Sequence, residues 1–128
     1  MILLDTHIFI WLVNNDENLP VNYQKLLETE QEKYISVITC WEILLLLKKD
    51  RLKLKSHFNE WISKSLNAFN IQVINLDLEI VLAYDSISNF HKDPADNLIA
   101  ATSISKKIPL LTLDSKLIKY KEIEILKL

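Results

Sequence analysis

The sequence predicts an α/β fold, a three-layer α/β/α domain with a mostly parallel central sheet. Short apolar runs typical of buried strands alternate with longer segments whose apolar residues recur at helical spacing. Turn and cap residues separate these segments, without repeats or low-complexity linkers. Strands that alternate with helices pair in parallel, because each helix returns the chain to the start of the next strand. With 128 residues and 49% hydrophobic content, residues 1–128 are expected to form a single domain.

The first half of the chain begins the alternation of strands and helices. Continuous apolar runs indicate the strands, and apolar residues at helical spacing after a capping hydroxyl or a proline indicate the helices. In chain order, we expect a strand over 2–4, a helix from its cap Thr6 to about Val13, a helix after Pro20 that ends at Glu30, a strand over 34–36, a helix over about 37–48, and a helix from its cap Ser56 to about Phe69.

The second half continues the pattern. Proline suits the first position of a helix, so the Asp93-Pro94 pair indicates a helix start. We expect a strand over 71–74, a helix over 77–86, a loop over 88–92, a helix from 93–94 to about Lys106, a strand over 110–112, a short helix after Asp114, and an edge strand over 123–126.

The chain contains no glycine. Loops that hold phosphate groups need backbone positions without a Cβ atom, so a P-loop, a Rossmann dinucleotide turn and a kinase glycine loop are excluded. Left-handed residues at helix ends are then expected to be asparagines. The asparagines near predicted helix ends are Asn14, Asn67, Asn70 and Asn89.

Four acidic residues lie at the starts of predicted helices, each beside an apolar run: Asp5, Glu42, Asp96 and Asp114. The carboxyl ends of parallel strands share one edge of a sheet, so these distant acids are expected to converge there. Several carboxylates in one place need a cation. Oxygen ligands favour Mg²⁺ or Mn²⁺ over zinc, because Cys40 has no second soft ligand and the three histidines lack metal-binding spacing. This pattern predicts a metal-dependent phosphodiesterase.

Each acid also has a purely structural explanation. Residues 39–42, Thr-Cys-Trp-Glu, match a capping box in which Glu42 would bond to a backbone amide. Asp93 is placed to cap its helix, with Asp96 stabilised by the helix dipole, whereas Asp5 and Asp114 also fit ordinary turns. The combination favours a site, because unrelated caps have no reason to follow nearly every strand at the same edge.

Four segments together carry a family resemblance: Leu3-Leu-Asp-Thr-His-Ile, Ile35-Ser-Val-Ile-Thr-Cys-Trp-Glu, His91-Lys-Asp-Pro-Ala-Asp-Asn and Leu111-Thr-Leu-Asp. In this order they resemble the PIN-domain ribonucleases, in the VapC-type toxin branch of toxin-antitoxin pairs. The resemblance implies a PIN fold, Mg²⁺ or Mn²⁺ dependence, endonucleolytic cleavage of RNA, inhibition by a small cognate antitoxin, and a homodimer. The acidic positions of the family fall on Asp5, Glu42, Asp96 and Asp114, with Asp93 as an adjacent second acid.

RNA hydrolysis assigns expected roles to these residues. Asp5 and Asp96 are expected to hold the principal metal, while Glu42 and Asp114 orient the attacking water or help to hold a second ion. Hydroxyls that aim the carboxylates are expected from Thr6 and Thr112, and no histidine is given a catalytic role. Relatives often have arginine where this chain has Asn97, which affects a phosphate or carboxylate contact but not the metal site.

Two other functions compete with a ribonuclease toxin. A receiver-type signalling domain also holds Mg²⁺ at a sheet edge, but it needs paired acids after its first strand and a lysine after its fifth. Here Asp5 is followed by Thr6, and Thr112 by Leu113. An inactive PIN fold kept for binding is disfavoured because all four acids remain.

The lone cysteine, the lack of a secretory leader and the lack of a long apolar run predict a cytoplasmic protein with no membrane span.

The remaining apolar and charged residues have plainer interpretations. Trp11 and Trp41 keep helical spacing with their apolar neighbours, and most of these residues, though not all, are expected in the core. The run over 43–47 is too apolar for one buried stripe, which suggests a dimer face or an antitoxin groove that Phe58 and Trp61 extend. Two basic clusters indicate weak nucleic-acid patches; their lysines and arginine are Lys48, Lys49, Arg51, Lys53 and Lys55, and Lys106, Lys107, Lys116, Lys119 and Lys121.

Overall fold

The central sheet of the computed structural model is parallel, as the sequence predicts. The structure describes residues 1–87, 93–119 and 123–126. Within them, four strands lie in the order β3-β2-β1-β4, and every paired strand is parallel to its neighbour. Their bounds are β1 (Ile2–Leu4), β2 (Lys33–Ser36), β3 (Ile71–Ile74) and β4 (Leu110–Leu111).

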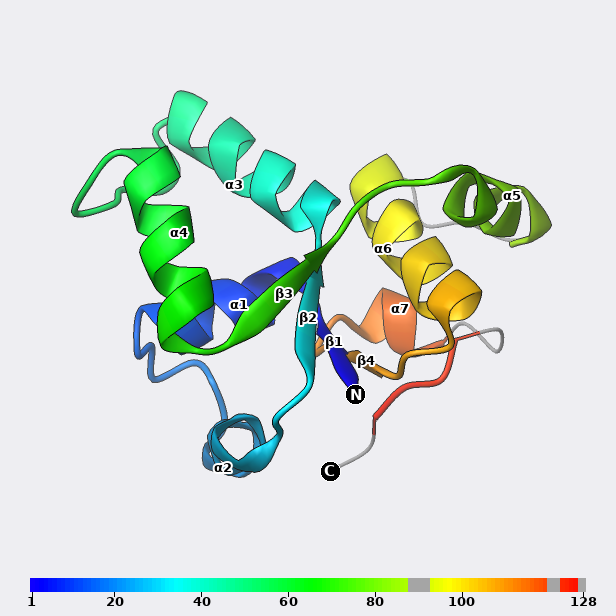
Figure 1. The fold of residues 1–128 in the computed structure, drawn as a ribbon, viewed down its shortest axis with the longest axis horizontal. Helices are drawn as coiled ribbons and strands as arrows, with labels where there is room; N and C mark the ends of the chain where they lie inside the picture. Colours follow the sequence, from blue (N-terminus) through cyan, green and yellow to red (C-terminus); the bar gives the residue numbers. More distant parts are fainter. Residues whose placement is uncertain (88–92, 120–122, 127–128) are drawn as a thin grey trace.

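Helices cover both faces of this sheet, which confirms the three-layer prediction (Figure 1). One face carries α1 (Thr6–Val13), α2 (Val21–Thr29), α3 (Val37–Lys48) and α4 (Phe58–Ala68). The other face carries α5 (Leu78–Ser86), α6 (Pro94–Lys106) and α7 (Ser115–Ile118). None of the helices in the described residues has the length and apolar character needed to cross a lipid bilayer.

Alternation along the strands divides the core into two clusters. In β1, Ile2 and Leu4 face the cluster under α1 and α4, whereas Leu3 faces the cluster under α6. Each of these side chains is at most 1% exposed. Burial of such a side chain contributes about 1.5–3 kcal/mol, so β1 is held from both faces and fixes the position of the residues that follow it.

Among the residues that the structure describes, four adopt left-handed backbone conformations where helices end. They are Asn15, Asp50, Asn70 and Lys107, with φ between 51° and 55°. The expected left-handed asparagine is confirmed at Asn70. The left-handed residue after α1 is Asn15 and not Asn14, and Asn67 lies inside α4, so these two predictions are wrong. Asn89 lies outside the described residues.

The end of α3 shows how this works without glycine. The amide of Arg51 donates to the carbonyl of Leu46 at 2.9 Å, and the amide of Asp50 donates to that of Leu47 at 3.2 Å. These two bonds form a Schellman motif with Asp50 at its left-handed position. The motif turns the chain sharply after Lys49.

Several expected boundaries differ from the structure by one residue, such as the start of β2 at Lys33, and three other differences concern α1, α4 and the expected last strand. Thr6 is the first helical residue of α1, and Asp5 is its cap, accepting from the Thr6 amide. Helix α4 begins at Phe58 rather than after Ser56. The expected edge strand over 123–126 is a single parallel bridge between Leu110 and Ile125, because only two backbone bonds, at Leu110 and Leu126, continue the sheet there.

Two tryptophans do not lie where the sequence suggests. Trp41 is 48% exposed, so it is one of the helically spaced residues that do not build the core. Trp61 is 9% exposed and packs edge-on against Phe9 with ring centroids 6.0 Å apart, so it does not line a surface groove. In the apolar run over 43–47, Ile43 is buried and the four leucines are half-buried.

Candidate metal centre

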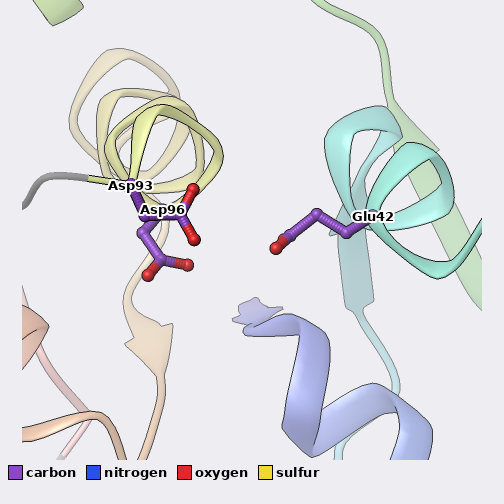
Figure 2. Close-up of side chains that lie close together, drawn as sticks. All are labelled: Glu42, Asp93 and Asp96. Carbon is purple, nitrogen blue, oxygen red and sulfur yellow. The ribbon is translucent and has the colours of Figure 1, made fainter. Parts of the chain in front are cut away.

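Acidic side chains gather at the carboxyl edge of the sheet. Asp5 follows β1, and Glu42 lies in the second turn of α3, which continues directly from β2. Asp93 and Asp96 come from the start of α6. The side chain of Glu42 points across the site toward both of them (Figure 2). The predicted convergence of distant acids is therefore present in the structure.

The closest group contains three of these acids. Glu42, Asp93 and Asp96 each offer a carboxylate oxygen, and these atoms all lie within 4.8 Å of one another. Asp5 and Asp114 are not in this group of three, but their negative charges act on Asp96. Asp93, which was expected only as an adjacent second acid, belongs to this group. Asp5, which was expected at the centre of the site, does not.

Hydrogen bonds hold Asp5 in a fixed orientation. One carboxylate oxygen accepts from the amide of Thr6 at 2.8 Å, and the other accepts from the hydroxyl of Thr112 at 2.7 Å. The Thr112 oxygen in turn accepts from the amide of Asp114 at 3.0 Å. Asp5 is 4% exposed and Thr112 is 1% exposed. Thr112 therefore links the acid after β1 to the turn after β4.

A second chain of hydrogen bonds holds Glu42. The hydroxyl of Thr6 donates to Oε1 of Glu42 at 2.6 Å, and the hydroxyls of Thr6 and Thr39 lie 2.9 Å apart. The capping-box interpretation is wrong, because Ser36 caps α3 by accepting from the amide of Ile38. Glu42 lies inside the helix and bonds to a side chain of α1.

The other acids also begin helices. Asp93 caps α6 by accepting from the amide of Ala95 at 2.9 Å, and Asp114 caps α7 by accepting from the amide of Lys116 at 2.9 Å. Asp96 occupies the first turn of α6, where the helix dipole favours negative charge. The predicted cap at Asp93 and the predicted first-turn position of Asp96 are confirmed, and neither role prevents the side chain from facing the centre.

Burial and mutual repulsion raise the pKa values of the central acids. The pKa of Asp96 rises to about 7, first because burial disfavours its charged form and then because Asp5, Asp93, Glu42 and Asp114 repel it. Burial also raises the pKa of Glu42, although the Thr6 hydrogen bond opposes this change. The pKa of Asp5 is raised by burial too, against its bonds from Thr112 and Thr6.

Two surface cavities open beside the acids, one on each side of His7. The first, of about 340 Å³, is lined by Asp5 and Asp114 together with Trp11 and Leu113. The second, of about 350 Å³, is lined by Glu42 and Asp93 and extends along α3. The side chain of His7 lines both cavities and packs against Trp11 with ring centroids 5.9 Å apart.

The donor set fits a hard divalent cation. All the clustered ligand atoms are carboxylate oxygens, which Mg²⁺ and Mn²⁺ accept and zinc sites rarely use alone. A bound cation would also offset the repulsion that raises the pKa of Asp96. Cys40, half-buried on α3 beyond the acid group, is not among the clustered residues.

Sequence reasoning missed Thr39 as a partner of the site. Its hydroxyl is fully buried and contacts Thr6. The three-residue spacing from Glu42 puts both side chains on the same face of α3, a signal that the apparent capping box concealed. The exposed indole of Trp41 beside the acids was also missed, because helical spacing alone does not show which apolar residues the fold covers.

Comparison with known proteins agrees with this geometry. The family model described as the PIN domain matches residues 2–123. The chain is similar to Ribonuclease VapC22 of Mycobacterium tuberculosis, with 26% identity over 117 residues, 91% of this chain and 88% of that protein.

Solved structures show the same fold. VapBC2 from Rickettsia felis, bound to a DNA fragment from their promoter, matches with 20% identity and a TM-score of 0.74 over 98% of both chains. FitAcB from Neisseria gonorrhoeae matches with 21% identity and a TM-score of 0.69 over 99% of this chain and 97% of the other. Because the family model extends over nearly the whole sequence, the chain belongs to the PIN domain family.

Proposed function

We propose that this protein is a Mg²⁺- or Mn²⁺-dependent endoribonuclease that acts as the toxin of a toxin-antitoxin pair. The observation that carries the proposal is the meeting of Glu42, Asp93 and Asp96 within 4.8 Å at the carboxyl edge of the sheet. The name of the related protein, a ribonuclease, supports RNA as the substrate. Membership of the PIN domain family gives no support to the receiver-type alternative.

We assign the principal metal position to Asp5 and Asp96, with Asp93 close enough to share it. Glu42 and Asp114 orient the attacking water or complete a second cation position. Thr6 and Thr112 act on the carboxylates rather than on the substrate, because their hydroxyls donate to Glu42 and Asp5. When bound, the ion supplies positive charge that polarises the scissile phosphate and activates water.

The electrostatics of the acids support this assignment. Five carboxylates at one edge repel one another, and the pKa of about 7 for Asp96 records that repulsion together with burial. A divalent cation bound among these carboxylates would offset their mutual repulsion, which favours its binding. The same charge repels RNA phosphate, so a bound cation should strengthen the contact between the acidic centre and the substrate.

Partners follow from the same proposal. Solved structures with the same fold include a toxin-antitoxin complex from Klebsiella pneumoniae, which supports a small antitoxin partner for this chain. A homodimer is supported by large apolar side chains that remain exposed on α5, where Leu78 is 71% and Leu82 is 60% exposed. Sedimentation of the purified protein tests whether it forms a homodimer.

We also infer a cytoplasmic location, where RNA is available and a lone thiol stays reduced.

The decisive experiment compares the wild-type protein with Asp5→Asn and Asp96→Asn on total RNA. Each protein is assayed with Mg²⁺, with Mn²⁺ and with excess chelator. We expect cleavage only by the wild type with a divalent ion, because each substitution removes a negative charge from the centre while retaining its shape. Equal cleavage in all samples would rule out the proposed site.

Expression in cells tests the toxin role separately. We expect the wild type to arrest growth and Asp96→Asn to leave growth unchanged. Growth arrest that persists in Asp96→Asn would show that nuclease action is not its cause. An absence of cleavage by well-folded wild type would favour the alternative of a PIN fold kept for binding.

A further inference from the structure

The cavity along α3 combines three kinds of wall beside the acidic centre. Its outer end carries two cationic side chains, Lys49 and Arg51, and its inner end contains Glu42 and Asp93. Leu45 and Leu46 form an apolar wall between the two ends, and Trp41 lines the cavity beside Glu42. The volume of about 350 Å³ falls within the usual range for small-ligand sites.

One face of α3 forms most of this cavity. Residues 41, 45 and 49 are four apart and therefore stack along the helix, with residues 42 and 46 beside them. Trp41 precedes Glu42 directly, so its 48% exposed indole lies next to the acidic centre. Lys49 lies eight residues after Trp41, about 12 Å further along the helix axis at a rise of about 1.5 Å per residue.

The Schellman motif at the end of α3 places the second cation. The left-handed residue Asp50 turns the chain back, so that Arg51 lines the same cavity as Lys49 although it lies beyond the helix. Both side chains are exposed, and within the described residues neither forms an ion pair with an acid. Their charges are therefore available to an anionic ligand.

We propose that this cavity binds a nucleotide of single-stranded RNA, whose base stacks on Trp41 while Lys49 and Arg51 contact a neighbouring backbone phosphate. The inference rests on the proposed ribonuclease function and names residues outside the acidic centre that hold its substrate. Aromatic side chains beside cations suit single strands, because unpaired bases expose their faces for stacking. In a duplex these faces are already stacked on one another.

Binding measurements use the Asp96→Asn variant as the parent, so that RNA is not cut. The probes are hexaadenylate RNA and a fully paired RNA duplex. We expect the single strand to quench tryptophan fluorescence and the duplex to leave it unchanged. Stacking contributes about 1–3 kcal/mol per base, so adding Trp41→Ala weakens binding of hexaadenylate by about 5- to 150-fold. Adding Trp41→Phe preserves most of the affinity and removes the quenching.

The cations are tested through salt dependence. Lys49→Gln and Arg51→Gln should each reduce the slope of log affinity against log salt concentration by about 0.7, the value for one phosphate contact to a single strand. Lys25→Gln is the matched control, because α2 leads into the amino end of β2 and lies at the opposite edge of the sheet. It should leave the slope unchanged.

The results separate this inference from the proposed function. Wild-type cleavage of RNA together with unchanged affinity in the Trp41→Ala variant would overturn the inference and leave the ribonuclease standing. Equal quenching by duplex would overturn it as well. If Trp41→Ala weakens capture of the antitoxin but not of RNA, the cavity is a protein-binding site and the inference is wrong. Thermal unfolding of each variant confirms that it is folded.

Discussion

The hydroxyl of Thr6 donates a 2.6 Å hydrogen bond to Oε1 of Glu42, which joins the first turn of α1 to the second turn of α3 across 36 positions of sequence. A threonine hydroxyl has one proton. With that proton given to Glu42, the 2.9 Å contact between Thr6 and Thr39 requires Thr39 to be the donor. The three residues thus form a directed chain that ends on a carboxylate of the acidic centre.

We predict that Thr6→Val lowers the affinity for Mn²⁺ by about 10-fold or more, the usual cost of losing a partner that orients a metal ligand. Valine keeps the shape of threonine but donates no proton, so Glu42 loses its partner. Isothermal titration with Mn²⁺ measures the effect. Thr6→Ser retains the hydroxyl and is the matched control. Equal affinities for the two variants would contradict a role for this hydrogen bond.

The raised pKa of Asp96 predicts that the metal-free protein loses stability as pH rises. In the unfolded chain this carboxyl has a pKa near 3.8, and in the folded protein it is about 7. Between these values the folded state holds the proton that the unfolded state has released. Stability is therefore fully present below about pH 4 and is lost as pH rises through 7. Solvent screening reduces the effect to about 1–2 kcal/mol.

Urea unfolding between pH 5 and 8 in excess chelator measures this dependence. Asp96→Asn removes the titrating group, so its free energy of unfolding should change less over the same range. Addition of Mg²⁺ should restore stability most strongly at pH 8, where the carboxylates are charged. A wild-type protein in chelator that becomes more stable from pH 5 to 8 would show that the charged form of Asp96 is not disfavoured.

Two substitutions at Asp93 are expected to separate folding from metal binding. Asn is a good helix cap, whereas Ala loses the hydrogen bond to the amide of Ala95. Asp93→Ala should lower the free energy of unfolding by about 1 kcal/mol, and Asp93→Asn should leave it nearly unchanged in chelator. Both should weaken Mn²⁺ binding, because both remove the negative charge. Full Mn²⁺ affinity in Asp93→Asn would place Asp93 outside the metal centre.

Lys107→Gly is predicted to stabilise the protein by about 0.5–1 kcal/mol. Lys107 is exposed and has φ 55°, a conformation that is unfavourable for a residue with a Cβ atom and favourable for glycine. Thermal and urea unfolding measure the change. Ser105→Gly is the control, because it places glycine inside α6 and should destabilise.

The acidic centre was predictable because topology determines it. Parallel strands end at one edge, so Asp5 and Asp114 had to lie near each other once the alternation of strands and helices was recognised. The connection of Thr6 to Thr39 was not predictable, since a local pattern at residues 39–42 offered Glu42 a partner within its own helix. Helix α3 starts at Val37, as expected, so Thr39 lies inside the helix and cannot be its cap.

The left-handed helix ends show a second limit. Asparagine adopts this conformation readily, and Asn70 followed that rule. Asp50 and Lys107 did not stand out, because lysine in particular has no preference for positive φ. The packing of α3 and α6 against the rest of the molecule determines where these helices end, and the residue at that position adopts the left-handed conformation whatever its type.

Three of the five acids, Asp5, Asp93 and Asp114, begin a helix with the same side chain that faces the centre. A substitution at any of these positions therefore changes both the charge of the centre and the cap of a helix. A descendant that has abandoned catalysis but still folds is expected to carry asparagine or serine there more often than alanine. The residues found at these three positions in related genes that have lost activity would show whether the helix cap or the negative charge is kept more strictly.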